Sequence, residues 1–159
     1  MSKVIKTNAM RILDAAGISY VSYTYQAEDG KIDGVSVAEK IGIPSDIVYK
    51  TLVTIGKSKD NYVFVIPVTL ELDLKKAAAA VGEKAVEMIM VKDLLKTTGY
   101  IRGGCSPIGM KSKLVTVFEE SAMLTEDIVV SGGMIGLQLQ MKVSDLITIT
   151  EASFADIIK

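Results

Sequence analysis

The chain has 159 residues, a length typical of one domain, and 49% of them are apolar and 23% charged, as in a globular protein with a sizeable core. The net charge of −1 excludes binding of nucleic acid through overall basicity, so such a partner would need a local patch. The absence of histidine and the single cysteine exclude Ser-His and Cys-His nucleophile pairs and an internal disulfide. We therefore expect one cytoplasmic domain over residues 1–159, with no bound metal and no membrane segment.

The first third of the chain alternates helical and strand patterns. Residues 7–16 place apolar side chains on one face and end at a glycine, which predicts a helix, and residues 20–25 predict a strand. Ser36 opens a capping box, so we expect a short helix that ends at Gly42.

A hairpin and two further helices are expected next. Residues 50–55 and 61–67 are rich in β-formers and are joined by a glycine-containing turn, which indicates a β-hairpin. Alanine and lysine dominate residues 72–80 and predict a helix. A short strand over 87–90 and a short helix over 91–97 follow.

The last part of the chain predicts three strands, at 115–118, 128–130 and 137–141, and then a helical tail from Val143. The hairpin argues against a doubly wound parallel sheet, which would need a helix after every strand. We therefore predict an α+β (mixed α/β) fold with a curved, mostly antiparallel sheet flanked by helices.

A glycine-rich loop over residues 99–111 is the most informative segment. Four glycines and a proline prevent regular structure there, and exposed backbone N–H groups can bind an anion or a polarised carbonyl. Between residues 92 and 113, five basic residues and one acid give a local charge of +4. The alternative is an ordinary tight turn. The basic residues are Lys92, Lys96, Arg102, Lys111 and Lys113.

Three further positions could carry chemistry. Lys50 leads into an apolar strand and could reach a cleft to bind an anionic group, although it could equally be a solvated strand-end lysine. Ser131 and Gly132 offer a hydroxyl and a bare amide, but they also fit a simple turn between two strands. Cys105 has no histidine to activate it, so we interpret it as a small loop residue rather than a nucleophile.

Several motifs together resemble the YbaK/EbsC family of bacterial Cys-tRNA(Pro) deacylases, which are related to the editing domain of prolyl-tRNA synthetases. The resemblance runs from about residue 6 to 157, and the order and spacing of the motifs are specific although each motif is weak alone. The main motifs are Tyr49-Lys50-Thr51-Leu52, Glu71-Leu72-Asp73-Leu74, Thr98-Gly99-Tyr100-Ile101-Arg102-Gly103-Gly104-Cys105-Ser106-Pro107 and Val130-Ser131-Gly132-Gly133.

The resemblance implies a fold, a reaction and a set of residues. The fold would be the YbaK/aminoacyl-tRNA synthetase-associated domain, with a barrel-like sheet. The reaction would be cleavage of the ester of mischarged Cys-tRNA(Pro) by the substrate's own thiol, without a cofactor. Lys50 and Gly103 would be catalytic. Because ester cleavage passes through an oxyanion, the backbone amides of both Gly103 and Gly104 are candidates to stabilise it. The residues that bind the substrate would be Tyr25, Thr51 and Ser131. Independently of the resemblance, the bare amide of Gly132 is a further candidate for substrate binding, and the local positive charge makes the five basic residues candidates for nucleic-acid binding.

The resemblance also implies tRNA(Pro) and, transiently, prolyl-tRNA synthetase as partners of a monomer or weak dimer. The chain departs from the family at two places. Met134-Ile135 replaces a basic pair of many relatives, and Asp33 stands where some relatives have an aromatic residue. Two alternatives therefore stay open: an editing deacylase for another small ester such as Ala-tRNA(Pro), or a non-catalytic protein that binds tRNA or the synthetase.

Overall fold

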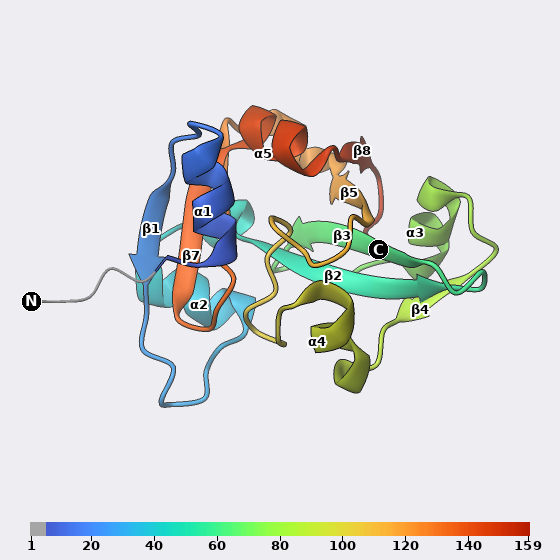
Figure 1. Ribbon diagram of the computed structural model, residues 1–159, viewed down its shortest axis with the longest axis horizontal. Coiled ribbons are helices and arrows are strands. Elements are labelled where there is room, and N and C mark those ends of the chain that lie inside the picture. Colours follow the sequence, from blue (N-terminus) through green and yellow to red (C-terminus); the bar gives the residue numbers. More distant parts are fainter. Residues whose placement is uncertain (1–5) are drawn as a thin grey trace, which may run out of the picture.

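Two β-sheets carry the fold (Figure 1). The computed structural model describes residues 6–159. A three-stranded sheet has the order β1-β7-β6, and a five-stranded sheet has the order β4-β2-β3-β5-β8. The strands are β1 (Val21–Thr24), β2 (Tyr49–Gly56), β3 (Asn61–Pro67), β4 (Val86–Met88), β5 (Val115–Glu119), β6 (Asp127–Ser131), β7 (Leu137–Lys142) and β8 (Ser153–Ala155).

Short helices surround the sheets, and within residues 6–159 none is long and apolar enough to cross a bilayer. Local signals set their ends: the Asp73 carboxylate accepts the amides of Lys75 and Lys76, and Gly82 ends the same helix in the left-handed conformation. Figure 1 shows α1 beside the smaller sheet and α3 at the far end of the β2–β3 hairpin. The helices are α1 (Asn8–Ala15), α2 (Gly34–Ile41), α3 (Leu74–Val81), α4 (Val91–Thr98), α5 (Val143–Thr150) and the 3-10 helices η1 (Ser45–Ile47) and η2 (Glu120–Leu124).

The predicted hairpin and the α+β class are confirmed. Strands β2 and β3 pair antiparallel from Tyr49↔Pro67 to Ile55↔Asn61. The β3–β5 and β5–β8 pairs are parallel, whereas the other four strand pairs are antiparallel. The expectation of a barrel-like sheet is wrong. The two described sheets meet only at an isolated bridge between Val48 and Val129, so the hydrogen-bond ladder does not continue around a barrel.

Most element boundaries differ from the sequence prediction by no more than two residues, and two elements differ further. The N-cap of helix α2 is Asp33 rather than Ser36, because the Asp33 carboxylate accepts the Ser36 amide at 3.1 Å and the Ser36 hydroxyl at 2.7 Å. The tail is not helical throughout. Helix α5 ends at Thr150 and is followed by its C-cap Glu151, whose φ is +54°, and β8 then adds to the sheet beside β5.

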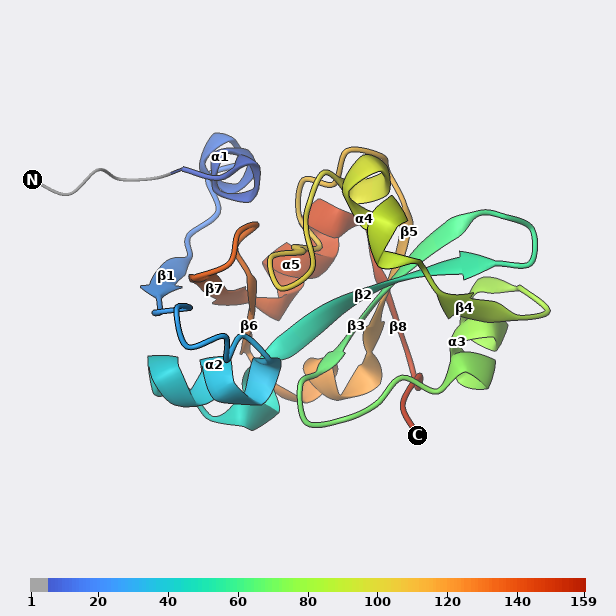
Figure 2. The same ribbon diagram turned by 90° about the horizontal axis from the view of Figure 1, so that it is seen from below.

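A continuous apolar core holds both sheets together. Leu13 of α1, Phe118 of β5, Leu139 of β7 and Leu146 of α5 belong to one cluster and are completely buried. Burying a side chain of this size stabilises a fold by about 1.5–3 kcal/mol. The loops at the junction of the two sheets are therefore supported by a rigid scaffold (Figure 2).

Candidate functional site

A cavity of about 820 Å³ lies at the junction of the two sheets. Segments distant in sequence form its walls: the loop before α2, the first half of β2, the β4–α4 segment, the glycine-rich loop and the ends of β6 and β7. Its size is in the range of sites for small molecules or single nucleotides. The side chains that bear on function are Ile32, Asp33, Lys50, Thr51, Leu94, Arg102, Gly103, Cys105, Ser131 and Gln138.

Lys50 is the half-buried cation of the cavity. It belongs to β2, opposite Ile66 of β3, so pairing within the hairpin holds its backbone in place. Its ammonium group has no ion pair or hydrogen bond with residues 6–159. A cation in a partly apolar cavity without a protein partner is suited to bind an anion or a developing oxyanion.

Two hydroxyl groups are buried without a hydrogen-bond partner in the described part of the chain. They are Thr51 Oγ1 and Tyr25 Oη. Thr51 lines the cavity, whereas Tyr25 is not one of its wall residues and its ring lies 5.7 Å from Lys40 Nζ. An unsatisfied buried hydroxyl costs about 1–3 kcal/mol, so a bound ligand or a water molecule would stabilise these groups.

The glycine-rich loop contributes Gly103 to the cavity wall. This residue has φ of +87°, which favours glycine, and its N–H group meets no acceptor in residues 6–159. The amide is therefore free to donate to a substrate oxygen.

Gly104 has a different place from the one predicted. Its amide donates to the Ile101 carbonyl at 3.0 Å, and it is not a wall residue of the cavity. A Cβ at this position would lie 2.9 Å from the backbone of Met134 and Ile135. The geometry thus gives Gly104 a packing role, in which two loops approach backbone to backbone, and does not support it as an oxyanion donor.

Of the two neighbouring residues Ser131 and Gly132, the first lines the cavity and the second has a structural role. Ser131 lines the cavity, and its Oγ accepts the Gly133 amide at 3.3 Å. The Gly132 amide donates to the Leu137 carbonyl at 2.9 Å, and its carbonyl accepts the Thr7 hydroxyl at 2.6 Å. Both backbone groups of Gly132 are occupied, so the prediction that it binds substrate is not supported.

Cys105 lines the cavity as a protonated thiol. Burial raises its pKa to about 12. Because the thiolate is the nucleophilic form, the group is inert near neutral pH. This agrees with its interpretation as a small loop residue.

The basic residues near the glycine-rich loop are only partly free. Arg102 is exposed and lines the cavity, and Lys92 and Lys111 are exposed without an ion pair to a described residue. Lys96 Nζ lies 3.0 Å from Asp93 Oδ1, and Lys113 forms an ion pair with Glu151. The local charge of +4 counted from the sequence therefore overestimates the positive charge of this surface, because the Glu151 carboxylate, which follows α5, pairs with Lys113.

The chain differs from the pattern of the resembling family at Asp33 and at Met134-Ile135. Asp33 lines the cavity, and Ile135 lies beside it. The Asp33 side chain caps α2, and the hydrogen bond from the Ser36 hydroxyl lowers its pKa. Ile135 packs against Gly103, where a Cβ would stand 3.4 Å from Ile135 Cγ1.

The sequence did not single out Ile32, Leu94 or Gln138 as wall residues. Gln138 stands between the apolar residues Leu137 and Leu139 of β7, a pattern typical of an outward-facing side chain, yet it is buried and lines the cavity. Apolar wall residues carry no chemical signature, so only the fold identifies them.

One acidic cluster outside the cavity has donor atoms close enough to bind a metal ion. Glu119, Glu120 and Asp156 place carboxylate oxygens within 4.8 Å of one another. Asp156 is already paired with Lys76 at 2.9 Å, and Glu119 accepts the Ser121 amide at 2.8 Å. These contacts give the cluster a structural role, and we assign no ion to it.

Comparison with known proteins identifies the type of domain. A family model described as the aminoacyl-tRNA editing domain matches residues 33–149. A curated protein of Enterococcus faecalis, named as a candidate Cys-tRNA(Pro)/Cys-tRNA(Cys) deacylase, EbsC, is 45% identical over 152 residues, which cover 96% of this chain and 93% of that protein.

Solved structures show the same fold. One, titled as a candidate trans-editing enzyme for prolyl tRNA synthetase, has a TM-score of 0.82 at 22% identity and matches 98% of this chain and 99% of its own. A hypothetical protein has a TM-score of 0.87 at 20% identity, over 96% of this chain and 100% of its own.

Proposed function

Because the chain belongs to the aminoacyl-tRNA editing domain family, we propose that it is a trans-editing deacylase whose best substrate is Cys-tRNA(Pro). The observation that carries this proposal is the Lys50 ammonium, which has no partner in residues 6–159 and lies in a cavity that the free Gly103 amide also borders. Lys50 and Gly103 supply positive potential for an oxyanion, and the unpartnered Thr51 hydroxyl supplies a hydrogen bond.

The proposed reaction uses the thiol of the substrate. The cysteinyl sulfur attacks its own ester carbonyl, a C–S bond forms, and the C–O bond to the terminal ribose breaks. The ribose oxygen takes a proton, and the four-membered thiolactone is then hydrolysed by water. No protein nucleophile is needed, in keeping with the absence of histidine and with the protonated state of Cys105.

The chain's own residues would hold the ester in place for this step. Positioning a thiol beside its own carbonyl can supply several kcal/mol of the activation barrier. Leu94, Ile32 and Cys105 exclude water from part of the cavity, which strengthens the electrostatic effect of Lys50. Arg102, an exposed residue of the cavity wall, and the exposed Lys92 of α4 would bind phosphates of the tRNA 3′ end.

Prolyl-tRNA synthetase is the proposed transient partner. The support is the trans-editing neighbour of the same fold, together with the resemblance of the sequence to the editing domain of that synthetase. The function does not require a permanent complex, since the cavity is formed by one chain.

A second candidate substrate is Ala-tRNA(Pro). A cavity of about 820 Å³ accommodates an alanyl ester as readily as a cysteinyl ester, so volume alone does not separate them. The test is single-turnover deacylation of tRNA(Pro) that carries Cys, Ala, Ser or Pro. We expect the cysteinyl ester to react fastest. A faster alanyl ester would favour the second candidate, and no cleavage of any ester would favour a non-catalytic tRNA-binding protein.

A further inference from the structure

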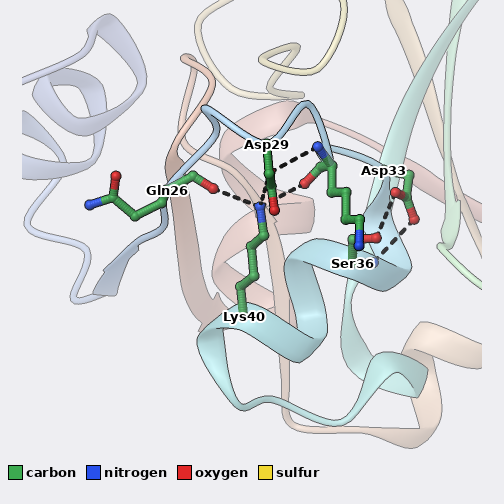
Figure 3. A network of polar contacts seen from close by, with 6 residues as sticks. Gln26, Asp29, Asp33, Ser36 and Lys40 are labelled. Atoms are coloured by element: carbon green, nitrogen blue, oxygen red, sulfur yellow. Dashed lines mark hydrogen bonds and ion pairs between the residues drawn. The ribbon is translucent and has the colours of Figure 1, made fainter.

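Lys40 makes a network of contacts that the proposed mechanism does not use (Figure 3). Its ammonium group donates to the Gln26 carbonyl at 2.6 Å, to Asp29 Oδ1 at 2.8 Å and to the Lys31 carbonyl at 3.0 Å. An ammonium group has three hydrogens, so this set of acceptors saturates it. Figure 3 shows the side chain reaching from α2 to the loop that precedes this helix.

The ammonium group of Lys40 makes the polar contacts that join the loop over residues 26–32 to the rest of the described protein. Its backbone hydrogen bonds stay within the loop: Gly30 donates to Ala27, and Ile32 donates to Gly30. The Asp29 carboxylate also accepts the Lys31 amide at 3.0 Å. In the part of the chain that the structure describes, every polar link from residues 26–32 to the rest of the protein runs through Lys40.

The same loop forms one wall of the cavity. Gly30 and Ile32 line it, and the Ile32 side chain lies against Gly103, whose amide faces the substrate in the proposed function. Tyr25, with its buried and unpartnered hydroxyl, immediately precedes the loop, and its ring lies 5.7 Å from Lys40 Nζ. A displacement of the loop would therefore move the wall residues Gly30 and Ile32 and alter the contact of Ile32 with Gly103.

We infer that Lys40 is a positioning residue, which holds the 26–32 loop against the cavity and thereby sets which aminoacyl group fits. This inference rests on the proposed function for its effect on substrates, but the anchoring of the loop does not. The hydrogen bond from Lys40 also contributes most to the lowered pKa of Asp29, as expected for a charge-assisted contact. The reacting ester makes no contact with Lys40 in this scheme.

Lys40→Met tests the inference, because methionine keeps the length of the side chain and removes the donors. Lys76→Met is the matched control, because Lys76 likewise joins a carboxylate, Asp156, and a carbonyl, that of Ile158, but lies outside the cavity. Hydrogen exchange over residues 26–32 should be about 3- to 10-fold faster in Lys40→Met and unchanged in Lys76→Met. Unchanged exchange in Lys40→Met would overturn the inference whether or not the protein is an enzyme.

Kinetics test the consequence for substrates. For Cys-tRNA(Pro) we expect KM to rise about 5- to 10-fold in Lys40→Met, with kcat within about twofold, and the preference for the cysteinyl over the alanyl ester to fall. Lys40→Arg should recover part of the loss, since a guanidinium can reach some of the same acceptors. A fall in kcat without a change in KM, or an unchanged ester preference, would overturn the positioning role. If the wild-type protein cleaves none of the esters, the proposed function fails, and hydrogen exchange still decides whether Lys40 anchors the loop.

Discussion

The side chain of Ile32 lies against the backbone of Gly103, so closely that a Cβ on the glycine would stand 2.8 Å from Ile32 Cδ1. The contact joins the loop before α2 to the glycine-rich loop, and both loops line the cavity. Gly103 also has φ of +87°. Its lack of a side chain therefore serves both the backbone conformation and the contact between the two walls.

Gly103→Ala is expected to destabilise the protein and to slow deacylation. The left-handed backbone conformation costs an alanine about 1–2 kcal/mol, and displacement of Ile32 adds about 1–3 kcal/mol. Gly17→Ala is the control, because Gly17 also has positive φ, +70°, but a Cβ there meets no atom within 4 Å. Urea unfolding should give the larger loss for Gly103→Ala, and Ile32→Ala should restore part of it. Equal losses at the two glycines would show that the contact is unimportant.

Lys50→Met is expected to lower the deacylation rate by about 10²-fold or more, the usual effect of losing one oxyanion contact. The free energy of unfolding should change by no more than about 0.5 kcal/mol, because Lys50 has no partner in residues 6–159 to lose. Lys57→Met, at the exposed turn of the same hairpin, is the matched control and should keep the wild-type rate. A folded Lys50→Met protein with normal single-turnover rates would remove Lys50 from the mechanism.

The sequence predicts the secondary structure well because its signals are local. The alanines and lysines of residues 72–80 indicate α3, and the glycine-containing turn between β2 and β3 marks the hairpin. Barrel closure depends instead on pairing between distant strands, and the single bridge from Val48 to Val129 shows how little of this pairing forms. Such long-range pairing has no local signature.

The candidate site was predicted at the level of loops but not of individual atoms. Lys50, Gly103 and Ser131 do line one cavity. Gly104 and Gly132 carry the same backbone groups as Gly103, yet their amides are occupied by the carbonyls of Ile101 and Leu137. Which amide of a glycine-rich segment is free depends on the turn that the loop adopts, and residue identity alone does not determine this turn.

The basic residues should contribute unequally to tRNA binding. Each phosphate contact adds about one unit to the slope of log K against log salt. Arg102→Ala and Lys92→Ala should therefore flatten the slope. Lys96→Ala and Lys113→Ala should change it less, because Asp93 and Glu151 already pair with these lysines. Filter binding over a salt series measures the slopes, and equal effects at all four positions would contradict this division.

Stability should fall at alkaline pH through Cys105. Burial raises the pKa of its thiol to about 12 in the folded protein, whereas a thiol in an unfolded chain titrates near about 8.5. Above pH 8.5 the unfolded state loses this proton and the folded state keeps it. The unfolded state is therefore favoured by up to about 1.4 kcal/mol per pH unit until pH 12 is approached.

Urea unfolding at pH 7, 9 and 10.5 measures this effect. Cys105→Ala should remove the thiol contribution and lose less stability than the wild type between pH 9 and 10.5. Burial is the main cause that raises the pKa of Tyr100 to about 12, and the charge of Cys105 adds to it, so the part due to burial is common to both proteins and cancels in the comparison. Identical pH profiles for the two proteins would show that the thiol is more accessible than its burial indicates.

The last prediction concerns the nucleophile. In the proposed reaction the sulfur comes from the substrate, so Cys105→Ser should keep most of the activity, since the buried Cys105 thiol is protonated at neutral pH. Cys-tRNA(Pro) and Ser-tRNA(Pro) differ only in sulfur and oxygen, and the thiol is more acidic and more nucleophilic than the hydroxyl. Under single-turnover conditions we therefore expect the cysteinyl ester to react much faster. Equal rates for the two esters would indicate attack by water instead, with Lys50 and the Gly103 amide stabilising the same oxyanion. An inactive but folded Cys105→Ser protein would place the nucleophile on the protein, at a thiol whose burial must then be relieved when the substrate binds.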